Sequence, residues 1–359
     1  MPNASFFASR AFAEVDTAAI AANFCTVSAH CGKKAIAVVK ANAYGHGVEL
    51  AVPALVAAGC RFFAVATPDE ALAVRALAPD ADILVLGYTP PDAAAQLSEG
   101  RITQTVFSTE YALALAKTGV PLAVHIKIDC GMCRLGFSPA QIREINALFA
   151  LKTLTVTGLF THFPCADTDV ARTRAQLARF CLLRAALPRP LFAHAAASAA
   201  ALALPEAVLD APRVGLALYG ISPVAGIALR PALRLCAPLV QIREIAPGTA
   251  VSYGGDFVAR SPTRIGVLPC GYADGLHRCL QGMTVHLCHN GITFPLSLCG
   301  RICMDQCMVD LGNTPAEVGD VVCLYRDVEA VAARAGTIPY EILSNISPRV
   351  VRWEKGRMK

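Results

Sequence analysis

Up to about residue 230, short apolar runs alternate with alanine- and leucine-rich stretches of helical character. Eight runs with the composition of buried strands begin near Lys34, Phe62, Ile83, Thr103, Leu122, Leu154, Leu191 and Arg213. The segments between them, such as DEALAVRALA and EYALALAKTG, predict helices. Strands that alternate with helices and carry near-continuous apolar sequence form parallel sheets buried on both faces. The pattern therefore predicts an α/β fold, a TIM-like (β/α)₈ barrel, with a doubly wound open sheet as the alternative.

After Pro231 the helical alternation stops, and runs such as TRIGVLP, MTVHLCHNGITFPL and DVVCLY predict strands joined by turns. The pair Asn290-Gly291 between apolar runs indicates a tight hairpin. We therefore expect a barrel over 12–230 and a mostly antiparallel β-domain over 231–359, which also takes in about residues 1–11.

Composition narrows the class of protein. Of the 359 residues, 55% are apolar and 16% charged, which excludes a disordered chain, and the net charge of +5 is spread out and gives little support to nucleic-acid binding. No run is long enough to span a membrane and no signal peptide is evident. The 15 cysteines are an odd number and too few for a disulfide scaffold. We expect a cytoplasmic protein with reduced thiols and no membrane or nucleic-acid partner.

Polar side chains follow several of the predicted barrel strands. Lys40 closes the first strand, Thr161-His162 closes the sixth, and Ser198 follows the seventh. The carboxyl ends of barrel strands meet at one mouth, where barrel enzymes place their sites. A lysine there becomes a nucleophilic amine if burial and a neighbouring cation lower its pKa; otherwise it is a surface lysine just past the sheet edge.

Long motifs in a fixed order carry a resemblance to a known family. They are AVVKANAYGHG, HIKIDCGMCRLGF, GLFTHF, HAAASAA and RVGLALYGISP in the first domain, then VSYGGDF, LPCGYADG, GRICMDQCMVDL and YEILSNISPRVVR in the second. Together they cover nearly the whole chain and resemble the alanine racemase family, enzymes of fold-type III that depend on pyridoxal 5'-phosphate. The resemblance implies an isomerase that interconverts L- and D-alanine and supplies D-alanine for peptidoglycan.

The resemblance implies that Lys40 attaches the cofactor and then acts as one of two acid/base groups, the other being Tyr272. Two groups are needed because racemisation removes the α-proton from one face and returns a proton to the opposite face. It also implies that Arg213 faces the pyridine nitrogen of the cofactor, with His162 orienting Arg213. A guanidinium does not readily give up its proton, which argues against an aminotransferase.

Further roles come from the same resemblance. Arg134 donates to the phenolic oxygen of the cofactor and lies by the substrate, and Lys127 matches a lysine that many family members carry as a carbamate. The residues implied to hold the cofactor phosphate are Tyr44, Ser198, Gly215 and Tyr340. Met304 offers its backbone N–H to the substrate carboxylate, with Asp305 beside it. In the family, Tyr272, Met304 and Asp305 come from the partner chain, so a homodimer is implied.

Three positions depart from the family pattern. Ala197 stands where asparagine is usual, and Cys130 and Cys133 stand where threonine and glycine are usual. None of the three changes removes a catalytic group, but they leave the substrate preference open. A broader-specificity or serine racemase is therefore an alternative. A fold-type III decarboxylase is opposed by Arg213, and a non-catalytic cofactor-binding protein by the second domain. The cysteine and histidine clusters lack four converging ligands, so we expect no metal.

Overall fold

The computed structural model describes residues 10–356, and its contacts divide the chain into two compact units. One unit is the barrel, residues 18–231. The other combines residues up to Thr17 with residues 232–359. Residues 1–11 were expected to belong to the β-domain, and of these residues 1–9 lie outside the described part of the chain.

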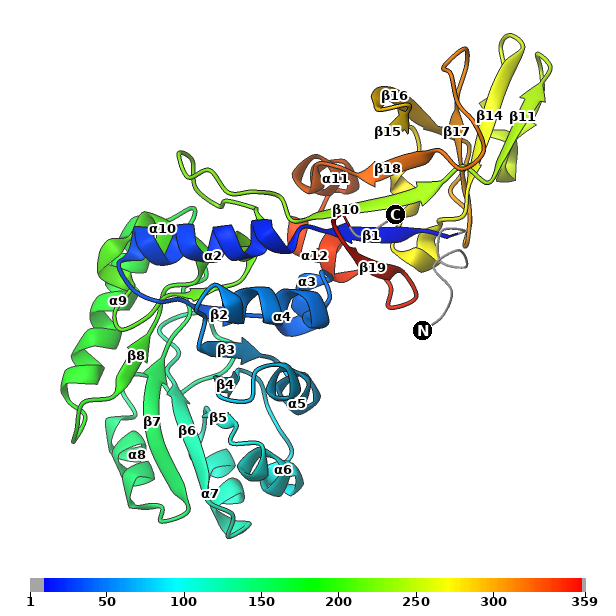
Figure 1. Ribbon diagram of the computed structural model, residues 1–359. Helices are drawn as coiled ribbons and strands as arrows, with labels where there is room; N and C mark the ends of the chain where they lie inside the picture. Colours follow the sequence, from blue (N-terminus) through cyan, green and yellow to red (C-terminus); the bar gives the residue numbers. More distant parts are fainter. Residues whose placement is uncertain (1–9, 357–359) are drawn as a thin grey trace. The chain divides into compact units, whose positions relative to one another are not determined.

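Eight parallel strands form the sheet of the barrel unit, which confirms the predicted count and order (Figure 1). In sheet order they are β8 (Phe192–His194), β7 (Leu154–Phe160), β6 (Leu122–Lys127), β5 (Thr103–Val106), β4 (Asp82–Val85), β3 (Phe62–Val65), β2 (Ile36–Val38) and β9 (Arg213–Val214). A backbone bond of 2.8 Å from the Arg213 N–H to the Ala196 carbonyl connects β9 to the segment after β8. The sheet therefore has the barrel arrangement rather than an open one.

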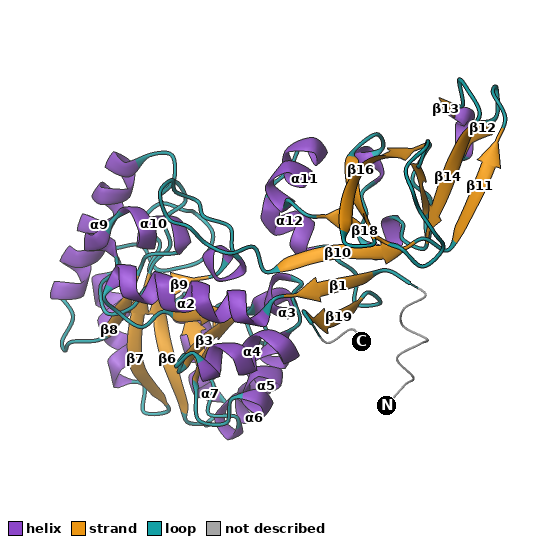
Figure 2. Ribbon diagram, turned by 45° about the horizontal axis from the view of Figure 1, so that its top comes forward, coloured by secondary structure: helices purple, strands orange, loops and turns teal. Residues whose placement is uncertain are grey.

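Helices pack along the outside of these strands, as Figure 2 shows. They are α2 (Thr17–Cys31), α4 (Val48–Ala57), α5 (Pro68–Leu77), α6 (Ala94–Glu99), α7 (Thr109–Lys117), α8 (Ile142–Ala147), α9 (Val170–Ala185) and α10 (Ser198–Ala203), whereas the short α3 (Lys40–Tyr44) follows the carboxyl end of β2. Local sequence fixes several of their starts. At α5 the Thr67 hydroxyl and the Glu70 carboxylate form a reciprocal capping box, and Pro68 occupies the first turn, where its missing N–H costs nothing.

A nine-stranded, mostly antiparallel sheet forms the second unit. In sheet order its strands are β11 (Gln241–Ile245), β14 (Thr263–Leu268), β17 (Cys307–Asp310), β16 (Ile292–Cys299), β15 (Thr284–His289), β18 (Val321–Tyr325), β10 (Leu233–Pro238), β1 (Phe12–Val15) and β19 (Val351–Glu354). A separate pair joins β12 (Ala250–Val251) to β13 (Phe257–Val258). The predicted hairpin joins β15 to β16, with φ of 49° at Asn290 and 78° at Gly291.

Two features of this unit differ from the sequence analysis, and a third, one parallel pair, lies within the mostly antiparallel sheet that was expected. Strand β1 lies between β10 and β19, so residues 12–17 group with the β-rich unit rather than with the barrel. The β1–β19 pair is parallel. Two helices, α11 (Val328–Ala335) and α12 (Pro339–Ser344), interrupt a region where only strands and turns were expected.

Candidate active site

The carboxyl ends of the barrel strands bring eight of the expected residues to one mouth. Lys40 and Tyr44 lie in α3 after β2, Lys127 ends β6, Arg134 lies in the loop after β6, His162 follows β7, and Ser198 begins α10. Arg213 and Gly215 belong to β9 and the turn after it. Parallel strand direction alone explains why residues so far apart in sequence share this edge.

Lys40 begins a turn of unusual handedness. Ala41, Asn42, Ala43 and Tyr44 all have φ of 52–55°, which is the left-handed region. This conformation costs roughly 1–2 kcal/mol per residue when a Cβ is present. The carboxylate of Glu70 braces the turn by accepting the Ala41 N–H at 2.6 Å. Glu70 was not singled out from the sequence, although the Thr67-to-Glu70 spacing marks a capping box.

The environment of Lys40 favours the neutral amine. Burial lowers the pKa of Lys40, the positive charges of Arg134 and Arg213 lower it further, and the charge of Glu70 opposes them. An amine with a lowered pKa is a better nucleophile near neutral pH.

Tyr44, Ser198 and Gly215 meet in one place. A Cβ built on Gly215 would lie 2.5 Å from the Tyr44 hydroxyl, so only glycine fits there. The Ser198 hydroxyl accepts the backbone N–H groups of Gly215 and Ala217, each at 3.3 Å. Two hydroxyls and two backbone N–H groups thus gather at the start of a helical turn, which is a donor set suited to an anion.

Arg213 is buried and bonds to both expected and unexpected partners. Its Nη2 donates to the Thr161 carbonyl at 3.0 Å and to His162 Nδ1 at 3.1 Å, and its Nη1 donates to His194 Nδ1 at 2.8 Å. An arginine can only donate, so both histidines accept through Nδ1 and, when neutral, carry their proton on Nε2. Burial and the charge of Arg213 lower the pKa of His162 to about 3, which keeps that ring neutral.

His194 continues the chain of bonds into the barrel interior. Its Nε2 lies 3.0 Å from His125 Nδ1, and burial lowers the pKa of His125 to about 4. A Cβ at Gly158 would lie 2.4 Å from the His125 ring, so the glycine makes room for it. Neither His125 nor His194 was predicted as a site residue, because a histidine inside a strand looks like an ordinary core residue.

Lys127 is buried at the end of β6. Its Nζ donates to the Ile128 carbonyl at 3.0 Å and lies 5.4 Å from the centre of the Phe160 ring. Burial and the charge of Arg213 lower the pKa of Lys127 to about 7. The Arg134 loop is shaped by Asp129, which accepts the Arg134 N–H at 3.1 Å.

The three departures from the family pattern lie where they can affect this mouth. Cys133, beside Arg134, is exposed and has φ of 58°, a conformation that glycine adopts more easily. Cys130 is buried. Ala197 precedes α10 and provides no side-chain cap.

The remaining expected residues lie in the β-rich unit. Tyr272 begins a short turn after β14, Met304 and Asp305 lie in the loop between β16 and β17, and Tyr340 lies in α12. The Tyr272 N–H donates to the Cys303 carbonyl at 3.0 Å, so the turn that begins at Tyr272 lies beside the loop that holds Met304 and Asp305. Tyr272 is 43% exposed and Met304 is 53% exposed within the chain.

The described residues contain neither a metal-binding cluster nor a membrane-spanning helix. Within residues 10–356, no group of three or more histidine, cysteine, aspartate or glutamate side chains is arranged to hold a metal ion. No helix in the described part of the chain is both long enough and apolar enough to cross a membrane.

Known proteins share both units. Residues 15–223 match the family described as alanine racemase, N-terminal domain, and residues 232–354 match alanine racemase, C-terminal domain. An alanine racemase of Desulfovibrio desulfuricans is 40% identical over 334 residues, covering 88% of this chain and 89% of the relative. The structure of a biosynthetic alanine racemase from Pseudomonas aeruginosa is 38% identical with a TM-score of 0.84, covering 96% of this chain and 99% of that one.

A structure of alanine racemase from Bacillus anthracis, with bound L-Ala-P, gives a TM-score of 0.90 at 32% identity and covers 97% of this chain and 96% of that one. Both sequence and structure thus agree over nearly the full length of these relatives. The chain therefore belongs to the alanine racemase family of isomerases.

Proposed function

We propose that the protein interconverts L- and D-alanine with pyridoxal 5'-phosphate, using Lys40 and Tyr272 as its two acid/base groups. The observation that carries the proposal is the buried guanidinium of Arg213, held by His162 and His194 beside the Lys40 turn. The family membership points to the same reaction. The role of D-alanine in peptidoglycan belongs to the proposal as well.

The residues at the barrel mouth fit this cofactor. The hydroxyls of Tyr44 and Ser198, with the N–H groups of Gly215 and Ala217, suit its phosphate. Arg213 spends three of its five N–H donors on the described residues, which leaves donors for an unprotonated ring nitrogen.

In the mechanism that we propose, bound pyridoxal phosphate supplies the electron sink for the charge left when Cα loses its proton. Lys40 would hold the cofactor through its amine until the amino group of the substrate takes its place, and the freed Lys40 amine would then exchange a proton with Cα on one face. Tyr272 exchanges a proton through its hydroxyl on the other face. Arg213 stays protonated and keeps the ring a moderate sink. Arg134 would donate to the phenolic oxygen of the cofactor and lie by the substrate. The backbone N–H of Met304 would donate to the substrate carboxylate.

Lys127 is proposed to carry a carbamate. The lowered pKa leaves part of its amine neutral near pH 7, which is the form that adds carbon dioxide and releases a proton. The resulting anion would hold Arg134 by a charge-assisted bond. Native mass spectrometry in bicarbonate buffer should show one added carbon dioxide that is absent from Lys127→Met; an unmodified amine would refute this part.

Exchange of the α-proton in deuterated water tests the two-base assignment. Lys40→Ala and Tyr272→Phe should each damage exchange from one enantiomer more than from the other, because each removes the group on one face. Tyr253→Phe, which changes an exposed tyrosine of the same unit, is the control. Equal, mild losses from both enantiomers would show that the assignment is wrong. Borohydride reduction of the protein loaded with cofactor, followed by peptide mapping, should label Lys40.

We also propose a homodimer in which Tyr272, Met304 and Asp305 complete the site of the partner. The exposure of Tyr272 and Met304 within one chain supports this arrangement. Inactive Lys40→Ala and Tyr272→Phe proteins, unfolded together and refolded, should regain up to about a quarter of wild-type activity, since half of the chains pair as hybrids with one intact site. No recovery from hybrids shown to form would exclude shared sites.

A further inference from the structure

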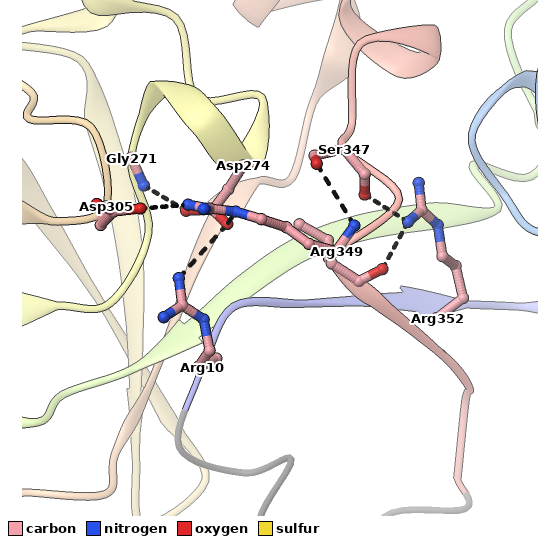
Figure 3. Close-up of polar contacts among 8 residues, drawn as sticks. Arg10, Gly271, Asp274, Asp305, Ser347, Arg349 and Arg352 are labelled. Carbon is pink, nitrogen blue, oxygen red and sulfur yellow. Dashed lines mark hydrogen bonds and ion pairs between the residues drawn. The ribbon is translucent and has the colours of Figure 1, made fainter.

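Three segments of the β-rich unit meet at a buried carboxylate, as Figure 3 shows. The carboxylate belongs to Asp274, two residues after Tyr272, and it is 1% exposed. Its Oδ2 accepts the Gly271 N–H at 2.9 Å and its Oδ1 accepts Arg349 Nε at 2.7 Å. Arg10 Nη2 lies 3.7 Å from the same Oδ1. A buried carboxylate without such partners would cost several kcal/mol, so this charge depends on the arginines.

Arg349 also binds the loop that holds Met304. Its Nη2 donates to Asp305 Oδ1 at 2.6 Å, so one planar guanidinium bridges the carboxylates of Asp274 and Asp305. Between these two anchors the backbones pair directly, with the Ala273 N–H donating to the Met304 carbonyl at 3.0 Å. The bridge therefore spans the two loops at the point where they run side by side.

The loops approach too closely to shift independently. A Cβ on Gly271 would lie 2.3 Å from the carbonyl oxygens of Cys303 and Met304. Tyr272 and Met304, in contrast, are 43% and 53% exposed, so packing within the chain holds them only in part. Their placement follows from the backbone on which they stand, and the charged bridge ties that backbone together.

We propose that Arg349 is a positioning residue of the reaction: by joining Asp274 to Asp305 it fixes the Tyr272 hydroxyl relative to the Met304 backbone N–H. This inference rests on the proposed function, because it assigns those two groups to proton transfer and to the substrate carboxylate. It also changes the expected role of Asp305, whose carboxylate serves the bridge rather than the substrate.

The test compares Arg349→Gln with Tyr272→Phe and with the double variant. Arg349→Gln should lower kcat roughly 10- to 100-fold, the range expected when a reacting group is misplaced by about 1 Å. α-Proton exchange should fall mainly for the enantiomer that also suffers in Tyr272→Phe. In the Tyr272→Phe background, the same substitution should have little further effect, because its target hydroxyl is already gone.

Two other variants keep the test decisive if Arg349→Gln fails to fold. Arg349→Lys retains the charge but cannot bridge two carboxylates with a planar fork. Asp305→Asn leaves the bond to Asp274 intact and alters only the second anchor. Both should show the same one-sided loss of exchange, and Asp305→Asn should not simply raise KM. Arg234→Gln, which removes a surface ion pair with Glu14 in the same unit, is the matched control.

Two outcomes would overturn the inference while the wild-type protein racemises alanine. One is a loss that falls equally on both enantiomers; the other is a loss in the double variant equal to the product of the single losses. If the wild-type protein with bound cofactor does not racemise alanine at all, the proposed function fails first and takes this inference with it.

Discussion

The left-handed turn after Lys40 makes Glu70 the most informative residue to change in the barrel. Four residues in this conformation store roughly 4–8 kcal/mol at about 1–2 kcal/mol each, and the surrounding structure must hold them there. The Glu70 carboxylate accepts the N–H groups of Ala41 at 2.6 Å, Ala66 at 2.8 Å and Thr67 at 3.3 Å. One oxygen serves the turn and the other serves the start of α5.

Glu70→Gln keeps the shape but leaves one acceptor oxygen for two sets of donors. At least one bond to a charged group is lost, which is worth about 1.5–3 kcal/mol. We expect urea unfolding followed by circular dichroism to show a loss of stability of that size. Asp69→Asn, which removes the neighbouring carboxylate of the same turn, should cost about 0.3–1 kcal/mol through the helix dipole alone.

The same substitution should act on the Lys40 amine. The charge of Glu70 raises the pKa of Lys40 against the effects of burial, Arg134 and Arg213, so removing it should lower that pKa further. The pH dependence of amine labelling in the cofactor-free protein should therefore move to lower pH in Glu70→Gln and not in Asp69→Asn. Equal stability losses in the two variants, with no difference in their labelling profiles, would refute the brace.

The structure also predicts the direction in which substitutions at Lys127 and Cys133 change the stability of the protein. Lys127 has a pKa of about 7 when folded and 10.5 as its ordinary value, so the unfolded chain binds more protons between these pH values. Relative to Lys127→Met, wild type should therefore gain up to about 1.4 kcal/mol of stability per pH unit above pH 7, measured by urea unfolding in carbon dioxide-free buffer. A stability difference between the two proteins that does not change with pH would contradict the buried amine. Cys133→Gly should stabilise the barrel by up to about 1 kcal/mol, since it relieves a left-handed φ at some cost in chain entropy, whereas Cys133→Ser should not.

Local pattern was sufficient for most of the fold. All eight barrel strands begin close to their apolar runs, because strands buried on both faces need near-continuous apolar sequence. Strand β9 is the limiting case: only Arg213 and Val214 pair as a strand, and the apolar residues that follow form a turn. The Asn290-Gly291 hairpin was predictable because its backbone conformation selects those residues.

Pairing between distant segments was not predictable in the same way. Strands β1 and β19 come from opposite ends of the described chain and pair with each other, and the sequence of neither strand indicates which strand it pairs with. The turn after Lys40 gave no sign either, since residues 41–44 contain no glycine. The roles of His194 and Arg349 depend on partners far away in sequence, so only the folded chain reveals them.

Glu70 and Arg349 solve the same problem on the two units in the same way. Each is a charged side chain that holds the backbone next to a proposed acid/base group without being that group. Racemisation requires two groups placed on opposite faces of one carbon, so an error in either backbone affects one face only. Glu70→Gln should therefore favour loss of exchange from the enantiomer served by Lys40, and Arg349→Gln from the enantiomer served by Tyr272. If both variants impaired the same enantiomer, the two bases could not be supported separately, and the division of labour between the units would be wrong.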